Sequence, residues 1–189
     1  ALLPRPVLDY QRTDTRCDDW SADQRWHDRL VFEENLFKTW RGLVAKYSRI
    51  AEHPFSVDPA TLRRNDDPPD YIAFREAAIN LLIHQDYGDH NRKASLKWFT
   101  DRLIFWNPGD AFATTAQLLE SNEKDIRNPL IVNAFRRIGL SDQAGTGIRS
   151  ILRNWRELGR RTPRINNNKT DKSFELLLEN EPLITEAMQ

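Results

Sequence analysis

The most constraining feature of this sequence is a largely apolar segment, residues 76–87, with polar side chains at every fourth position. On an α-helix, which turns by about 100° per residue, Glu76, Asn80 and His84 form one stripe with about 40° between successive members. The residues between them are almost all apolar, so we expect this helix to be buried among other elements. A buried carboxylate and amide each need a partner that satisfies them.

The spacing Glu-x-x-x-Asn fits a hydrated magnesium ion held against a polyphosphate. The amide oxygen of Asn80 would ligate the metal, and the carboxylate of Glu76 would orient a water molecule. The other interpretation is a polar stripe satisfied by neighbouring backbone groups, because buried polar groups are usually just hydrogen-bonded. The pattern of residues by itself leaves both interpretations open.

Length and composition limit the class of protein. The chain has 189 residues, enough for one domain of ordinary size, and its 28 basic and 28 acidic residues give no overall attraction to nucleic acid. The single cysteine, Cys17, excludes an internal disulfide and suits a reducing cytoplasm. No apolar stretch approaches the roughly 18 residues of a membrane span, so we expect a cytoplasmic protein with no membrane partner. The chain opens with Ala1, and we expect it to be a fragment of a longer protein.

Apolar spacing and turn residues predict the order of the elements. Asp70 is expected to cap the central helix, which ends near residue 87. Helices interleaved with antiparallel hairpins predict an α+β sandwich with helices on one face of the sheet. We expect residues 1–69 to form a connecting segment that packs on a main domain, residues 70–189. The predicted strands are residues 7–11, 93–99, 102–106, 164–167 and 173–178, and the predicted helices are 30–50, 70–87, 115–120, 129–138 and 146–158.

Two glycine-containing loops are candidates for contact with a ligand. Gly145, Thr146 and Gly147 lie at the start of the last predicted helix, whose first amides and positive dipole end suit a phosphate. Asn107-Pro108-Gly109 follows a predicted strand. None of the seven glycines belongs to a G-x-x-x-x-G-K-[ST] motif, so the sequence excludes a P-loop helicase motor.

The order of these pieces resembles a known family. It is similar to the C-terminal ATP-binding-like domain of RecG-related transcriptional regulators, a divergent branch of the GHKL (gyrase, Hsp90, histidine kinase, MutL) fold. The resemblance covers residues 71–178 and implies a Bergerat-type sandwich with an antiparallel-rich mixed sheet. The matching segments are residues 75–80 (REAAIN), 84–87 (HQDY), 107–109 (NPG), 127–129 (RNP), 138–140 (IGL) and 145–148 (GTGI).

The resemblance also implies a site for ATP and Mg²⁺. Glu76 would be the catalytic carboxylate and Asn80 the magnesium ligand. The remaining nucleotide-binding residues would be His84, Asn107, Gly109, Arg127, Asn128, Gly145, Thr146 and Gly147. One departure stands out: the family's Asp-x-Gly-x-Gly, whose aspartate receives the adenine amino group, is replaced here by Trp106-Asn107-Pro108-Gly109. The short segment between the glycine loops leaves little room for a closing lid, so any hydrolysis is expected to be slow.

The resemblance predicts an ATP-binding regulatory module of a DNA-associated transcriptional regulator. DNA would be bound through the full-length protein, in which a Schlafen-type AlbA domain, absent from this chain, precedes the module. A homodimer is a further expectation. The alternative function is a degenerate module that has lost nucleotide binding and serves as a dimerisation or docking scaffold.

An arginine stripe marks the last predicted long helix. Arg149, Arg153, Arg156 and Arg160 recur at i, i+4, i+7 and i+11, opposite an apolar face, and are therefore expected to be exposed. One interpretation is a solvated surface. The other is a contact surface for nucleic-acid phosphates or an acidic partner.

Overall fold

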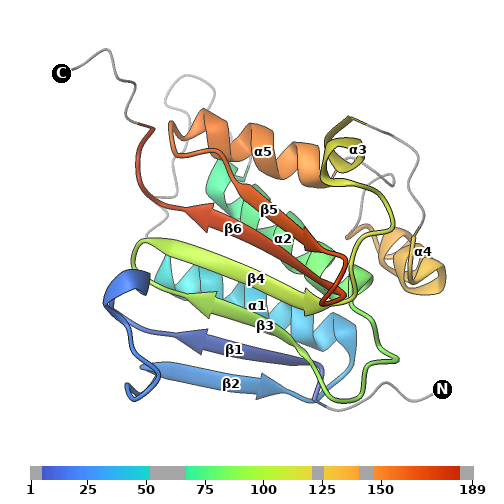
Figure 1. The fold of residues 1–189 in the computed structure, drawn as a ribbon, viewed down its shortest axis with the longest axis horizontal. Coiled ribbons are helices and arrows are strands. Elements are labelled where there is room, and N and C mark those ends of the chain that lie inside the picture. The colour runs from blue at the N-terminus through green and yellow to red at the C-terminus, as the bar shows by residue number, and fades with distance from the viewer. Residues whose placement is uncertain (1–5, 52–66, 121–125, 141–146, 184–189) are drawn as a thin grey trace, which may run out of the picture.

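The chain forms one mixed β-sheet with helices packed on it. The computed structural model describes residues 6–51, 67–120, 126–140 and 147–183. The sheet has six strands in the order β2-β1-β3-β4-β6-β5 (Figure 1). Only β1 and β3 run parallel, and the other neighbouring pairs are antiparallel. The strands are β1 (Leu8–Arg12), β2 (Asp28–Phe32), β3 (Ala94–Trp98), β4 (Arg102–Pro108), β5 (Arg164–Asn168) and β6 (Ser173–Glu179).

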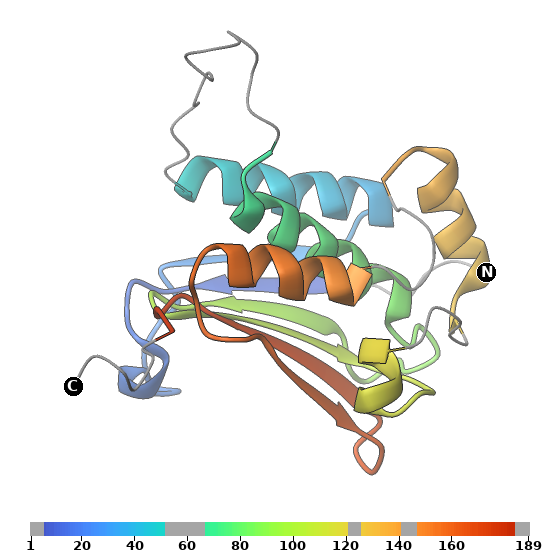
Figure 2. The ribbon, with the colours of Figure 1, turned by 90° about the horizontal axis from the view of Figure 1, so that it is seen from above.

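Three helices lie side by side on one face of this sheet (Figure 2). The middle one is α2 (Pro69–His84), which contacts α1 (Leu36–Ile50) on one side and α5 (Gly147–Glu157) on the other. The shorter helices α3 (Thr115–Glu120) and α4 (Pro129–Arg137) follow β4, and a 3-10 turn, η1 (Cys17–Asp19), follows β1. The predicted α+β sandwich is confirmed.

Helix α2 forms the centre of the core because its apolar residues run all the way round it. Phe74 is fully buried and stacks on Tyr47 of α1, with ring centroids 4.2 Å apart, while Phe105 of β4 meets it edge-on. Ile79 and Leu82 are also fully buried. Burying an aliphatic or aromatic side chain of this size stabilises a fold by about 1.5 to 3 kcal/mol, so the polar residues of α2 have a fixed position.

The start of α2 differs from the expectation. Pro68 occupies the N-cap position, and no side chain caps the helix there. Asp70 instead lies in the first turn and accepts a hydrogen bond of 2.6 Å from the Tyr47 hydroxyl, which ties α2 to α1. A proline at the first helical turn lacks the amide that a cap would satisfy, so the capping side chain is less needed.

Two strand boundaries also differ from the sequence prediction. Residues 28–29, expected to be irregular chain, and residues 30–32, expected to begin a helix, instead form the edge strand β2, which is defined by its pairing with β1. Strand β4 extends through Asn107 and Pro108, which we expected in a loop, because both pair with β6. Pro108 is the last residue of β4, so its missing amide donor does not interrupt the hydrogen bonds of the preceding strand residues.

The N-terminal segment contributes to the same sheet as the rest of the chain, because β1 lies between β2 and β3. A domain boundary near residue 70 stays a prediction. Among the described helices, none combines the length and the apolar character that a membrane crossing requires.

Candidate functional site

The polar stripe of α2 lies directly beneath the first residue of α5. A Cβ atom on Gly147 would be 3.0 Å from Nδ2 and 3.2 Å from Oδ1 of Asn80, and 3.4 Å from Oε2 of Glu76. Only a glycine lets the α5 backbone approach the amide and the carboxylate this closely. The structure thus brings together three of the predicted site residues from two distant parts of the sequence.

Burial differs along the stripe. Glu76 is buried, with 9% of its surface exposed, whereas Asn80 and His84 are half-buried. Within the described residues, the side chain of Asn80 makes no hydrogen bond, although it lies next to the backbone of Gly147. An amide that is half-buried against a helix start and has both donor and acceptor unused is a group available to a ligand. Gly145 and Thr146 lie outside the described residues.

The second predicted glycine, Gly109, marks a point where three segments meet. Its φ of +100° lies in the region that disfavours side chains, and a Cβ there would be 3.0 Å from the Asp86 amide nitrogen and 3.0 Å from Nε of Arg127. Its amide donates to the carbonyl of Lys172 (2.7 Å), and the Asp86 amide donates to the carbonyl of Pro108 (2.7 Å). Gly109 therefore joins β4 to the end of α2 and to the β5–β6 turn.

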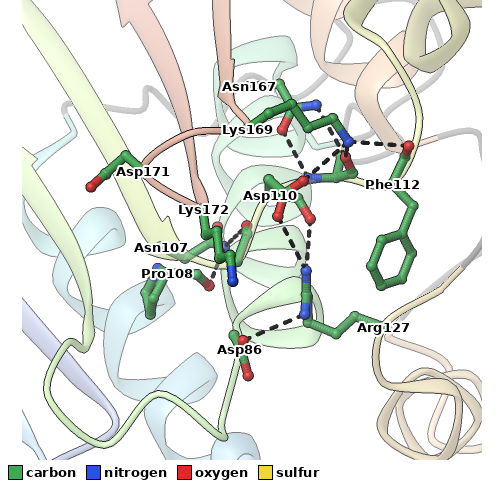
Figure 3. Close-up of polar contacts among 12 residues, drawn as sticks. Asp86, Asn107, Pro108, Asp110, Phe112, Arg127, Asn167, Lys169, Asp171 and Lys172 are labelled. Atoms are coloured by element: carbon green, nitrogen blue, oxygen red, sulfur yellow. Dashed lines mark hydrogen bonds and ion pairs between the residues drawn. The ribbon is translucent and has the colours of Figure 1, made fainter.

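Charged side chains pair with one another close to Gly109, which contacts Asp86 and Arg127 (Figure 3). Arg127 lies between two carboxylates: Nη1 is 3.5 Å from Oδ2 of Asp86, and Nη2 is 3.7 Å from Oδ1 of Asp110. Nη2 also donates to the Asp110 carbonyl (2.9 Å), and Nζ of Lys169 is 3.0 Å from the other carboxylate oxygen of Asp110. We call Asp86, Asp110, Arg127 and Lys169 the Arg127 cluster. Its charges neutralise one another within the protein.

The two predicted asparagines near this cluster hydrogen-bond to backbone. Asn128 donates to the carbonyls of Ile83 and Gln85, both at 2.8 Å, and so satisfies carbonyls at the end of α2. Asn107 is buried and donates to the carbonyls of Pro108 and Gly109 at 3.0 and 3.2 Å. Both side chains therefore stabilise the backbone near Gly109. Their contact with a nucleotide stays a prediction.

A buried tyrosine completes the end of α2. The hydroxyl of Tyr87 donates to the Leu82 carbonyl at 2.6 Å. Burial raises the pKa of Tyr87 well above its ordinary value, so the hydroxyl keeps its proton and remains a donor. Together with Asn128, it holds the end of α2 in place and therefore fixes the position of the polar stripe one to two turns earlier.

Sequence reasoning missed several residues that build this region. Asp110 and Lys169 belong to the Arg127 cluster, and Asn167 exchanges hydrogen bonds with the Ala111 backbone at 2.8 and 3.1 Å. The only sequence signal for them is the polar run 166–169 at a hairpin end and the acidic residue directly after Gly109. Lys169 and Asn167 lie more than fifty residues along the chain from their partners Asp110 and Ala111, so local patterns do not reveal these pairings.

The arginine stripe is shorter than predicted. Arg149, Arg153 and Arg156 are exposed on α5, but the helix ends at Glu157. Gly159, with φ of +66°, then turns the chain, as a glycine after a helix end commonly does. Arg160 consequently leaves the stripe, and its guanidinium lies 4.8 Å from the centre of the Trp155 ring.

The fold and this arrangement are consistent with a comparison against protein families. Residues 91–178 match the family described as "Putative ATP-dependent DNA helicase recG C-terminal". The similarity relates this segment to an ATPase-like domain associated with RecG-type proteins. The matched range contains Gly109, Arg127 and Gly147, but it begins after α2, so the places of Glu76 and Asn80 rest on the geometry of this chain alone.

A solved structure shares the whole fold. The DIP2311 protein from Corynebacterium diphtheriae aligns with a TM-score of 0.72 and 20% sequence identity, over 96% of this chain and 35% of that protein's chain. This chain thus corresponds to about a third of that longer protein, and the likeness concerns the fold. No curated protein matches the sequence.

Proposed function

We propose that this chain binds a magnesium-bound purine nucleoside triphosphate between α2 and the start of α5, and that the nucleotide is ATP. In this proposal it acts as a regulatory module of a DNA-associated protein. The single observation that carries the proposal is the close approach of the Gly147 backbone to Asn80 and Glu76. The RecG-type family match over residues 91–178 supports the class of function.

The residues at this point suit a magnesium polyphosphate. The first amides of α5 are free of helical partners and lie at the positive end of its dipole, which favours a phosphate group. The Asn80 amide offers an oxygen ligand beside them. Magnesium usually takes only one or two protein ligands and keeps several waters and phosphate oxygens, so one amide next to a phosphate-binding helix start is sufficient.

Glu76 provides the only carboxylate of the stripe. When bound, the metal would neutralise phosphate charge and make the terminal phosphorus more open to attack by water. The Glu76 carboxylate, fixed by the packing of α2, would accept a hydrogen bond from that water and hold its orientation. His84 lies two turns along the same helix face and is the next candidate for this role.

A second function, a scaffold that has lost nucleotide binding, is favoured by a different observation. Both hydrogen-bond donors seen at Asn107 go to carbonyls of its own turn, and this residue occupies the region where the resembled family has its adenine-binding aspartate. The Asn107 side chain is thus held by its own turn, and a neutral amide stands where the resembled family has the carboxylate that receives the adenine amino group. A scaffold would still need the Arg127 cluster, whose contacts are all internal.

Calorimetric titration with magnesium-ATP separates the two functions. We expect weak binding by the unchanged chain, no binding by Asn80→Ala, and retained binding by Asn133→Ala, a matched substitution at an exposed position of α4. Glu76→Gln should keep the binding and lose any slow turnover. Titration with magnesium-GTP in parallel tests whether the base is selected. If millimolar nucleotide produces neither heat nor a rise in melting temperature, nucleotide binding is wrong and the scaffold function stands.

A further inference from the structure

An exposed aromatic ring, that of Phe112, lies next to the Arg127 cluster (Figure 3). The residue has 52% of its surface exposed, and the guanidinium carbon of Arg127 is 4.7 Å from the centre of its ring. Single exposed apolar side chains are common on protein surfaces, so exposure alone does not identify a binding site. Two further features distinguish Phe112: the support of its backbone and its place in the fold.

The backbone around Phe112 is fixed by side chains from the end of β5 and the turn that follows it. Asn167 accepts a hydrogen bond from the Ala111 amide (2.8 Å) and donates to the carbonyls of Ala111 (3.1 Å) and Ala113 (2.9 Å). Nζ of Lys169 donates to the Phe112 carbonyl (3.1 Å). Binding to a segment that is already ordered costs less conformational entropy than binding to a loop that must first be ordered. The Phe112 ring is thus presented on a prepared backbone.

Phe112 lies at the same end of the molecule as the proposed nucleotide site. The Arg127 guanidinium beside its ring also contacts Asp86, which directly follows the C-terminal end of α2. Helix α3 begins three residues after Phe112 and contacts α5, and both ribbon views show α3 beside the start of α5 (Figures 1 and 2). Phe112 is therefore connected to both helices between which the nucleotide is proposed to bind.

The packing of α5 on α2 sets the direction in which a nucleotide would extend from its phosphates. From its start, α5 runs back along α2 toward the N-terminal end of α2 and packs against it (Figure 2). The α5 side chains Ile151 and Trp155 are fully buried on that side. A nucleotide whose phosphates lie at the start of α5 would consequently extend its base toward the C-terminal end of α2, where Phe112 lies.

We propose that Phe112 stacks on the base of the bound nucleotide, an inference that rests on the proposed nucleotide site. Arg127 lies against the Phe112 ring and is itself held between Asp86 and Asp110, so the ring has a fixed support. The exposed surface of the ring can accept a planar base. Stacking needs no particular pattern of hydrogen-bonding groups, because every base presents a π-face. It therefore provides base binding in a site where Asn107 replaces the aspartate of the resembled family.

A second pair of the same residue types offers a direct comparison. Phe37 on α1 is also exposed, at 41%, and the guanidinium carbon of Arg41 is 5.7 Å from the centre of its ring. Helix α2 lies between α1 and α5, so Phe37 is on the far side of α2 from the proposed phosphate position (Figure 2). The two phenylalanines thus share exposure and an arginine neighbour and differ in their relation to the nucleotide site.

The test is calorimetric titration with magnesium-ATP and with magnesium tripolyphosphate, which carries the phosphates without a base. The unchanged chain should bind magnesium-ATP more tightly than tripolyphosphate. Phe112→Ala should weaken magnesium-ATP binding by about 5- to 150-fold, the usual effect of removing a stacked aromatic ring, and leave tripolyphosphate binding unchanged. Phe112→Trp should retain magnesium-ATP binding, because indole also stacks on a base. Magnesium-CTP should bind the unchanged chain more weakly than magnesium-ATP, since a pyrimidine offers less surface for stacking, and Phe112→Ala should reduce this difference.

The matched control is Phe37→Ala, which should bind both ligands as the unchanged chain does, and melting temperatures verify that each variant is folded. If Phe112→Ala binds magnesium-ATP unchanged, or loses tripolyphosphate binding to the same extent, the stacking role is wrong while the phosphate site stands. An equal loss of magnesium-ATP binding in Phe37→Ala would also overturn it. If the unchanged chain binds neither ligand, the proposed function itself fails, and the stacking role fails with it.

Discussion

Two glycines that closely approach polar groups of other segments, Gly109 and Gly147, do so in contrasting surroundings. At Gly109 the neighbouring charges, Asp86, Arg127, Asp110 and Lys169, pair with one another and close the protein on itself. At Gly147 the neighbours are the half-buried amide of Asn80 and the carboxylate of Glu76. A glycine at a close contact can therefore hold two segments of the protein together, which we call a structural joint, or it can form part of a candidate ligand site. The polar groups around the glycine distinguish these two cases.

The largest effect on stability is expected at Gly109. Gly109→Ala would place a Cβ 3.0 Å from the Asp86 backbone, at a φ of +100°. The unfavourable backbone region and the overpacking together should cost about 3 kcal/mol of unfolding free energy. Chemical denaturation measures this loss. Gly139→Ala is the control, because Gly139 has a φ of +72° but no atom within 4 Å of its Cβ position, so it should show only the backbone part. Equal losses at the two glycines would show that the close contact contributes nothing.

An intermediate effect is expected at Asp101, a buried carboxylate that is held by the Cys17 amide and by Arg102. Burial raises the pKa of Asp101, but hydrogen bonds from the Cys17 amide (2.8 Å) and Arg102 lower it by more, so the pKa lies below its ordinary value. Asp101→Asn should cost about 1 to 2 kcal/mol at neutral pH.

The pH dependence follows from the direction of that shift. A lowered folded-state pKa means that the stabilisation is complete above the unfolded value of about 4 and disappears as pH falls through the folded value. The difference in melting temperature between the unchanged chain and Asp101→Asn should therefore shrink below about pH 4. A difference that persists unchanged in acid would show that the carboxylate charge is not what stabilises the η1 turn.

The smallest effect on stability is expected at Gly147. Gly147 does not have a positive φ, and the atoms nearest its Cβ position are the ends of the Asn80 and Glu76 side chains, which can shift at little cost. Gly147→Ala should therefore leave the melting temperature nearly unchanged but weaken magnesium-ATP binding about tenfold, because the ligating amide is displaced. If Gly147→Ala lost as much stability as Gly109→Ala, Gly147 would be a second structural joint, and the two glycines would not differ in role.

Local sequence patterns predicted most of the elements and the helical stripe of the candidate site. The bounds of α3 match the prediction, and each bound of α4 and α5 lies within one residue of its predicted position. These bounds are predictable because apolar spacing and glycines mark the helix ends in the sequence. The edge strand β2 was missed because its sequence, DRLVF, has weak alternation and depends on β1 for its pairing. Arg160 was misplaced although Gly159 two residues past the helix end signals a reversal.

The candidate site also contains one part that local sequence patterns predict and one part that they do not. The stripe of Glu76 and Asn80 follows from helical periodicity alone, and its position beside Gly147 agrees with the order of motifs. The Arg127 cluster could not be derived, because Asp86, Asp110 and Lys169 come from three segments that only the sheet register brings together. Long-range register depends on the whole packing and leaves no local signature.

The parallel pairing of β1 with β3 has a practical consequence for anyone dividing this protein. A fragment that began near residue 70, or that kept only the family-matched residues 91–178, would lose β1 and leave β3 as an open edge. Ala94 and Leu96 on β3 are fully buried in the intact fold and would be uncovered. Trp98 would also lose its stacking partner, Tyr47, because α1 would be removed together with β1. Unpaired apolar edges recruit other chains. The smallest soluble fragment should therefore begin before Leu8, well ahead of the region that sequence similarity outlines.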